Sequence, residues 1–380
     1  MTLISKLLKI KTLSTAVVTT VSFSSLSMAQ STAGVYTLWS KGGVRTNALG
    51  GATVALDGDG ATFVENAAAM VYQSGPLSGN FAYAQPEDKL HRPAGTIKQT
   101  EDYAIMEGSA LLFRHVALGM GFQVLRFFSE NTPAPDLNYK FKNSIADAHI
   151  GGAIKLGPLS FSGSYLIDSA RHTLDSTQGE TRKIESTLLS GNSQKYGLLM
   201  RFNAHINAGA TYRKATILKA DSTAGDVKFF DLAYQPEIAQ FGVLFSTHPR
   251  KLKRAGFFPT GAQFLLQIDR IDFPNLPRDG RLYSAPGLAF KSTDKFELDT
   301  REKWIPRIGI ETAIARVKGF ALVGRAGMYK EPAYLKNENS RLHNTFGAHL
   351  RLMIMSAQIT MDVANKYVSK NYGFGLEFEN

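Results

Sequence analysis

Arginine side chains stand at alternate positions in apolar stretches near the end of the chain, at Arg307, Arg325 and Arg351, with His349 close to the last. A guanidinium group offers a planar fork of donors that matches a carboxylate, so arginines gathered on one surface could bind the head group of an anionic ligand. The same arginines could instead pair with carboxylates inside the protein. Both interpretations stay open, and these four residues form the candidate ligand-binding set.

A second candidate set lies in Gly42–Val71, a stretch rich in glycine and alanine. It contains Asp57, Asp59 and Asn66, and a buried carboxylate needs a cationic or hydrogen-bonding partner. We therefore expect these three residues to fasten the stretch to basic residues elsewhere in the fold. The alternative is a latch that opens, which would use the same contacts.

Gly50 and Gly51 belong to the same set, because glycine adopts turn conformations that other residues resist. The stretch has too few large apolar side chains to build a core of its own, and only Asn66–Val71 is expected to form a short helix. We predict that the stretch is an insert enclosed by later parts of the chain.

The sequence gives little support for catalysis or metal binding. The eight histidines are scattered without zinc-binding spacing, and the glycine-rich runs lack the Lys-Ser/Thr of a phosphate loop and the glutamate of a calcium loop. No Gly-x-Ser-x-Gly motif of a hydrolase is present. There is no cysteine, which excludes disulfides and thiolate ligands. We expect no enzymatic activity, no metal site and no cofactor.

The N-terminus has the three parts of a secretory signal peptide, so we expect residues 1–29 to be removed after Ala29. These parts are a basic region at Lys6, Lys9 and Lys11, an uncharged stretch at Thr12–Met28, and a small-x-small site at Ser27-Met28-Ala29. The formal net charge is +11, and removal of the three lysines leaves +8. Export argues against nucleic acid as a partner, and anionic lipid head groups are the expected counterpart.

Strands are the elements that must position the candidate residues. About fourteen segments alternate apolar and polar residues, and a period of two places each set on one face of a strand. In one segment Leu159, Phe161, Tyr165 and Ile167 oppose Ser160, Ser162 and Ser164; in the last, Tyr372, Phe374, Leu376 and Phe378 oppose Gly373, Gly375, Glu377 and Glu379. Beyond the N-terminus, no apolar run reaches the ~18–20 residues of a spanning helix.

The connections between these segments alternate in length, which favours an outer-membrane β-barrel over a soluble sandwich. Tight turns are expected at Arg114-His115, Gly157-Pro158, Asn203-Ala204, Lys318-Gly319 and Ile354-Ser356, and long polar connections at 85–102, 128–144, 168–192, 217–233, 272–303 and 330–342. Such barrels have short periplasmic turns and long external loops. Thr247–Gly261 breaks the pattern and is interpreted as a basic periplasmic loop.

The stretch Asn47–Met70 resembles the N-terminal signature of the FadL-type outer-membrane transporter superfamily, which also includes the PorV-like proteins. The shared pattern is Ala48-Leu49-Gly50-Gly51-Ala52, then Asp57-Gly58-Asp59, then Asn66-Ala67-Ala68, where the family has proline in place of Ala67. The resemblance implies an all-β, fourteen-stranded transmembrane antiparallel barrel with an N-terminal hatch in its lumen. It also implies passage of hydrophobic substrates by way of the barrel wall.

We therefore expect three parts: a signal peptide at 1–29, a hatch or plug segment at 30–76 and an outer-membrane barrel at 77–380. The expected location is the outer membrane of a Gram-negative-type bacterium. The expected function is transport of hydrophobic or amphipathic small molecules of the long-chain fatty acid or hydrocarbon type. The alternative is a PorV-like barrel that binds a secreted or surface protein. Expected partners are outer-membrane lipid, a hydrophobic ligand and the barrel assembly machinery, which would read Phe378 near the C-terminus.

Overall fold

The computed structural model describes most of the chain between Gly43 and Glu377. The described ranges are 43–56, 63–73, 75–88, 98–134, 137–178, 180–224, 232–247, 261–272, 302–317, 319–333, 339–365 and 367–377. Residues 1–29, the predicted signal peptide, lie outside them. No helix in the described ranges is long and apolar enough to cross a membrane.

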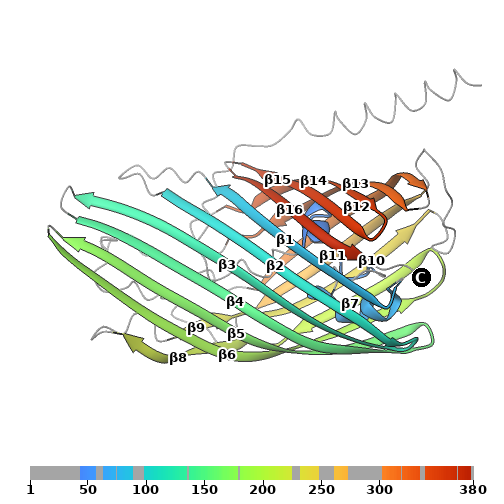
Figure 1. Ribbon diagram of the computed structural model, residues 1–380, viewed down its shortest axis with the longest axis horizontal. Coiled ribbons are helices and arrows are strands. Elements are labelled where there is room, and N and C mark those ends of the chain that lie inside the picture. Colours follow the sequence, from blue (N-terminus) through green and yellow to red (C-terminus); the bar gives the residue numbers. More distant parts are fainter. Residues whose placement is uncertain are drawn as a thin grey trace, which may run out of the picture.

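The described chain forms one antiparallel sheet of sixteen strand segments, shown in Figure 1. They are β1 (Leu77–Asp88), β2 (Lys98–Phe113), β3 (Val116–Ala134), β4 (Leu137–Leu156), β5 (Leu159–Gln178), β6 (Thr181–Arg201), β7 (Ile206–Arg213), β8 (Thr216–Ala224), β9 (Leu232–Gln235), β10 (Glu237–Ser246), β11 (Ala262–Asp272), β12 (Lys303–Val317), β13 (Phe320–Glu331), β14 (Arg341–Leu352), β15 (Met355–Ala364) and β16 (Tyr367–Glu377).

The sheet closes into a barrel of fourteen strands. β1 pairs with both β2 and β16, and β5 pairs with β6, so the strand order returns on itself. β7 and β8 are two parts of one strand, because both pair with β6. β9 and β10 are likewise two parts of one strand, because β9 pairs with β8 and β10 pairs with β7. Sixteen segments therefore make the predicted fourteen strands, and the predicted fold class is confirmed.

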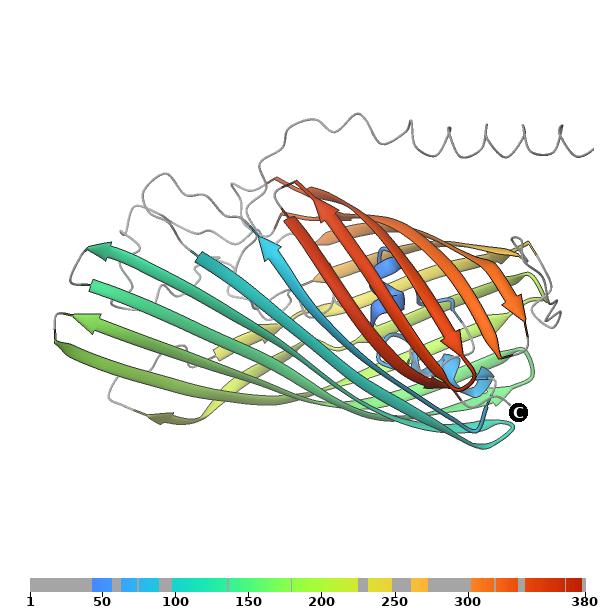
Figure 2. The same cartoon turned by 45° about the horizontal axis from the view of Figure 1, so that its top comes forward.

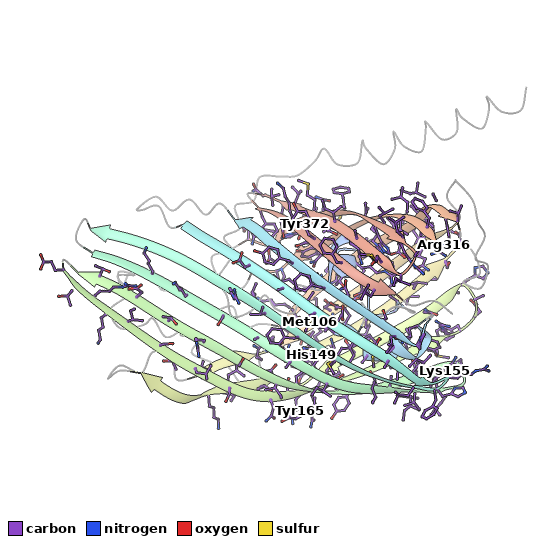
Figure 3. The ribbon with its side chains drawn as sticks, in the orientation of Figure 1. Met106, His149, Lys155, Tyr165, Arg316 and Tyr372 are labelled. Carbon is purple, nitrogen blue, oxygen red and sulfur yellow. The ribbon has the colours of Figure 1, made fainter. Side chains whose placement is uncertain are left out.

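The outer surface of the barrel is apolar and the inner surface is polar. Phe161, Tyr165, Phe374 and Leu376 are 47%, 47%, 64% and 48% exposed, whereas the alternate residues Ser160 and Asp168 are fully buried. Tyr165 projects from the outside of the barrel in Figure 3. An apolar outer face with a polar interior is the arrangement of a barrel surrounded by lipid. The alternation in the sequence therefore predicted the correct face for Phe161, Tyr165, Phe374, Leu376 and Ser160.

The tight turns at Arg114-His115, Gly157-Pro158 and Asn203-Ala204 are where the sequence placed them. The turn expected at Ile354–Ser356 lies at Met353-Ile354 instead, because Met355 and Ser356 pair with β14. Lys318 of the fifth expected turn lies outside the described residues.

Two of the expected long loops are mainly strand. β3 and β4 pair from Val116↔Ile154 to Ala134↔Leu137, and β5 and β6 pair from Leu159↔Met200 to Gln178↔Thr181. The expected connections 128–144 and 168–192 are thus mainly strand, and β8 and β9 occupy much of 217–233. Polar residues on both faces hid the strand period there. Figure 2 shows β3–β6 running well past the ends of β13–β16.

The described part of the N-terminal stretch contains two short helices. α2 (Val44–Ala48) was not expected, whereas the 3-10 helix η3 (Ala67–Tyr72) forms close to the predicted Asn66–Val71, with Asn66 as its N-cap. α2 is only 5 residues long and has no side-chain cap, so its local sequence signal is weak. Contacts with the barrel wall stabilise it instead, as described below.

The position of the lipid-facing residues leads to a stability prediction. Tyr165 lies near the middle of the apolar belt on β5, and Ser164, its neighbour, points to the lumen. Tyr165→Arg should lower the free energy of unfolding by ~2–4 kcal/mol because arginine at the bilayer midplane is costly. Ser164→Arg should cost less. Denaturant unfolding in lipid vesicles measures both, and equal costs would contradict the assignment of faces.

Candidate functional site

The N-terminal segment, defined here as residues 43–56 and 63–73, lies inside the ring of strands (Figure 2). Its α2 helix contacts β13, β14, β15 and β16, whereas its η3 helix contacts β2, β3, β4, β5 and β6. These strands lie on different sides of the ring. The segment therefore bridges the lumen rather than following one part of the wall.

Two consecutive glycines turn the chain after α2. Gly50 and Gly51 have φ of 63° and 79°, the left-handed region that favours glycine. The turn aims the Gly50 carbonyl at Arg307, whose Nη1 donates to it at 2.9 Å. Asp269 accepts a second bond from Arg307 Nε at 2.6 Å. The two glycines thus act through the backbone, by presenting a carbonyl to a buried cation of the wall.

Arg45 is the charged residue that attaches α2 to the wall. Its Nε and Nη2 donate to the two carboxylate oxygens of Glu311, at 3.0 and 2.9 Å. Arg325 Nε donates to the same Glu311 at 2.7 Å, and its other nitrogens lie 2.9 Å from Gln358 Oε1 and 3.1 Å from His349 Nδ1. One carboxylate is therefore shared between a cation of the segment and a cation of the wall.

Asn66 connects three parts of the structure. Its Nδ2 donates to the carbonyl of Val54 at 2.7 Å and to the carbonyl of Leu198 on β6 at 3.2 Å. Its Oδ1 accepts from Ala68 N at 3.2 Å, which caps η3. Asn66 is fully buried, so each of these bonds satisfies a group that water does not reach. The residue joins the two halves of the segment to each other and to the wall.

Val64 is held through its backbone from two sides of the lumen. Its N–H donates to Glu107 Oε2 on β2 at 3.0 Å, and its carbonyl accepts from Lys195 Nζ on β6 at 2.7 Å. Gln267 on β11 performs a similar task, because its Oε1 accepts from the N–H groups of Thr53 and Val54 at 2.8 and 2.9 Å. Irregular backbone inside the lumen thus finds its partners in side chains of the wall.

Further wall side chains hold carbonyl groups of the segment. Each donor is buried and comes from a different strand: Ser160 donates to Ala68, Asn207 to Ala55, Thr345 to Ala48 and Thr360 to Val44, at 2.8 to 3.1 Å. Together with the bonds above, these contacts distribute the attachment around the ring instead of concentrating it at one point.

A buried ion cluster lies on β4, β5 and β7 beside the segment. Asp147 and Asp168 are directly opposite each other, and Arg213 binds both carboxylates, at 3.1 and 2.9 Å. Gln123 donates to Asp147 at 3.1 Å and Ser193 to Asp168 at 2.8 Å. Sequence analysis missed Asp168 as a lumen residue because it assigned 168–192 to a loop.

The structure brings together most of the predicted site residues. Gly50 contacts Arg307, and Arg325 contacts His349, in the attachment network described above. Arg351 lies apart at the β14–β15 turn, where its Nε donates to the Met353 carbonyl at 3.1 Å. Asp57 and Asp59 lie outside the described residues, so their role stays a prediction. Sequence reasoning missed Arg45, Glu107 and Lys195, since alternation indicates which face a residue takes but not its distant partner.

Comparison with known proteins gives no sequence relative. No protein-family model matches the chain, and a search of curated proteins found no match. In the described residues, no group of three or more His, Cys, Asp or Glu residues is arranged to hold a metal ion.

Solved structures share the fold at low sequence identity. The chain is similar to the Pseudomonas putida toluene transporter TodX, with a TM-score of 0.58 and 13% identity over 90% of this chain and 97% of that chain. It is similar to the Ralstonia pickettii toluene transporter TbuX, with a TM-score of 0.57 and 10% identity over 90% and 100%. A Pseudomonas aeruginosa FadL homologue has a TM-score of 0.58 and 8% identity over 92% and 98%.

These similarities establish the fold, which is that of FadL-type outer-membrane transporters, as the N-terminal signature implied. The matched proteins are described as transporters or as a FadL homologue.

A glycine of the wall offers a test of how tightly the segment is docked. A methyl group at Gly327 on β13 would collide with the backbone of Leu49 and Gly50, whereas one at Gly163 on β5 would meet nothing within 4 Å. Gly327→Ala should therefore destabilise docking of the segment by roughly 1–3 kcal/mol, the usual cost of overpacking. Hydrogen exchange of residues 43–56 should quicken, while the barrel remains assembled.

Gly163→Ala is the matched control and should leave hydrogen exchange of the segment at the wild-type rate. Slow, unchanged exchange in Gly327→Ala would contradict the close approach of the segment to β13.

Proposed function

We propose that the protein is an outer-membrane transporter for hydrophobic or amphipathic small molecules, of the long-chain fatty acid or hydrocarbon type. The observation that carries this proposal is the attachment of the N-terminal segment across the lumen, through contacts with β2–β6 on one side and β13–β16 on the other. A segment held in this way closes the lumen to water, ions and hydrophilic solutes. It acts as a plug, and hydrophobic molecules reach the lumen without an open aqueous channel.

Two of the three candidate arginines, Arg307 and Arg325, take part in holding this plug. Arg307 binds Asp269 and the Gly50 carbonyl, and Arg325 binds Glu311 and Gln358. A guanidinium already held by a carboxylate at 2.6 or 2.7 Å would have to lose that bond to take a ligand head group. Arg307 and Arg325 are therefore fastening residues in this proposal, and apolar contacts provide most of the ligand binding.

An apolar row above the ion cluster supports a hydrophobic ligand. Tyr103, Leu125, Ile145, Ala170 and Leu189 are successive register partners on β2 to β6, and all are at most 2% exposed. They face the lumen two residues farther from the tight turns than the row that contains Asp147 and Asp168. They form one buried apolar cluster with Phe63, Val64 and Met70 of the segment, so a guest that reaches the plug on this side of the lumen meets apolar surroundings.

The fold comparisons agree with this class of substrate. TodX and TbuX are described as toluene transporters, which carry a small aromatic hydrocarbon. The shared fold and the apolar outer surface support a location in the outer membrane, with the tight turns in the periplasm and the long ends of β3–β6 outside. The predicted signal peptide is consistent with this route.

Uptake into vesicles tests the proposed function. Vesicles containing the full mature chain should take up toluene or a long-chain fatty acid faster than protein-free vesicles, because the barrel gives these molecules a path across the membrane. A hydrophilic sugar of comparable size should enter at the protein-free rate. Sugar entry that rises with protein content would show an open aqueous channel. Failure of both hydrophobic probes to enter faster would contradict transport of either class.

A second candidate function is a PorV-like role in binding a secreted or surface protein. It is favoured by the extension of β3–β6, whose pairing continues to Ala134↔Leu137 and Gln178↔Thr181, well beyond the apolar belt. A wall of this height offers a protein-sized surface outside the membrane. A stable protein partner co-purifying at equal stoichiometry, together with no hydrophobic uptake, would favour this role.

A further inference from the structure

The outward face of β3–β5 changes from apolar to cationic along the register. Within the belt, Met120, Ile150 and Tyr165 face outward as register partners and are 69%, 63% and 47% exposed. Six residues farther along each strand, the corresponding row is Arg126, Ser144 and Arg171. The two arginines therefore stand directly above the apolar belt, on the side away from the tight turns.

Three exposed cations gather there on neighbouring strands. Arg126 and Arg171 flank Ser144, and since neighbouring strands are ~4.8 Å apart, the two arginines start roughly 10 Å from each other. Lys142 lies two residues beyond Ser144 on β4, between the arginines. All three are exposed. We call these three residues the cationic triangle.

Two described acids lie near the triangle. Asp102 on β2 is opposite Arg126 and accepts a hydrogen bond from the neutral hydroxyl group of Tyr83 at 3.2 Å, so its negative charge offsets one of the three cations. Asp175 on β5 accepts from Arg182 through both oxygens, at 2.8 and 2.6 Å, and this hydrogen bonding holds the pKa of Asp175 below its usual value. With three cations against Asp102, and with Asp175 paired to Arg182, the described charges leave an excess of positive charge toward the solvent.

The excess is local to this side of the barrel. At the outer ends of β10, β11 and β12, Arg270 is surrounded by Glu237, Asp272 and Glu302, at 3.4, 3.3 and 3.0 Å. That group carries more acid than base. Positive charge is therefore not spread evenly over the outer ends of the described strands.

We propose that Arg126, Lys142 and Arg171 bind the phosphate groups of an anionic glycolipid in the outer leaflet of the membrane. Their height matches the level at which lipid head groups begin, directly above the apolar belt. Arginine forks fit phosphate oxygens, and several cations on one interface act together on an anionic lipid surface. Binding of these phosphates would attach the extended strands β3–β6 to the lipid head groups beside them. This inference rests on the membrane orientation given under the proposed function.

The test removes the triangle's charge from the full mature chain. Arg126→Gln, Lys142→Gln and Arg171→Gln are combined, and binding is measured to phosphatidylethanolamine vesicles that contain purified lipopolysaccharide or the same material after dephosphorylation. The triple variant should bind the phosphorylated glycolipid about 100-fold more weakly than wild type, which corresponds to about 3 kcal/mol for three interfacial cations. Wild type should prefer the phosphorylated over the dephosphorylated material by a similar factor.

The matched control removes three exposed lysines from other strands, Lys214→Gln, Lys330→Gln and Lys370→Gln. It should retain at least a third of the wild-type affinity. Equal losses in both triple variants would show a general charge effect, and equal binding of the two glycolipid preparations would show that phosphate is not recognised; either result overturns the proposal. Hydrophobic uptake into phosphatidylethanolamine vesicles should be the same in wild type and both variants, so failure here leaves the transport proposal standing.

Discussion

The structure depends on a constraint imposed by irregular backbone inside a barrel. A segment that is neither long helix nor strand leaves many N–H and C=O groups unpaired, and each needs a partner where water is scarce. The wall supplies those partners from side chains. Val64 is held by Glu107 and Lys195, and Gln267 holds the N–H groups of Thr53 and Val54. The polar inner face of the barrel is therefore largely explained by the backbone it has to satisfy.

The charged side chains in the lumen are subject to the same requirement for partners. A fourteen-stranded barrel is wider than the eight-stranded size whose interior its own side chains can fill. The lumen can accommodate charged side chains only if they are paired, and Glu311 between Arg45 and Arg325 shows how the segment takes part in that pairing. Arg213 between Asp147 and Asp168 shows the wall pairing with itself. Both arrangements bury charge, so removal of one member would leave another uncompensated.

The barrel was predictable because lipid imposes a simple rule. Alternation places Tyr165 and Phe374 outside and Ser160 inside, and all three are on the predicted face. Above the belt the rule lapses, since both faces of β3–β6 meet polar surroundings. Their outer parts were therefore assigned to loops, and Asp168 was missed because it is the first residue of one of these expected loops. Alternation of apolar and polar residues thus identifies the parts of a strand that cross the membrane, but not the parts that extend beyond it.

The attachment site was only partly predictable. Gly50, Gly51 and Asn66 were visible because turn and cap chemistry is local. The partnership of Arg45 with Glu311 spans 266 positions in the sequence, and that of Val64 with Lys195 spans 131. No local pattern specifies such a pair, because it follows from barrel closure and from where the segment crosses the lumen.

Ionic conductance of single barrels in planar lipid bilayers tests most directly the central claim that the N-terminal segment closes the lumen. The comparison is between the mature chain and a variant lacking Thr46–Met70, with assembly of both verified by a faster gel mobility before boiling than after it. The account predicts a nearly silent wild type and a steady, high conductance in the variant. An assembled variant as silent as wild type would contradict the account, because the lumen would then be closed by something other than this segment.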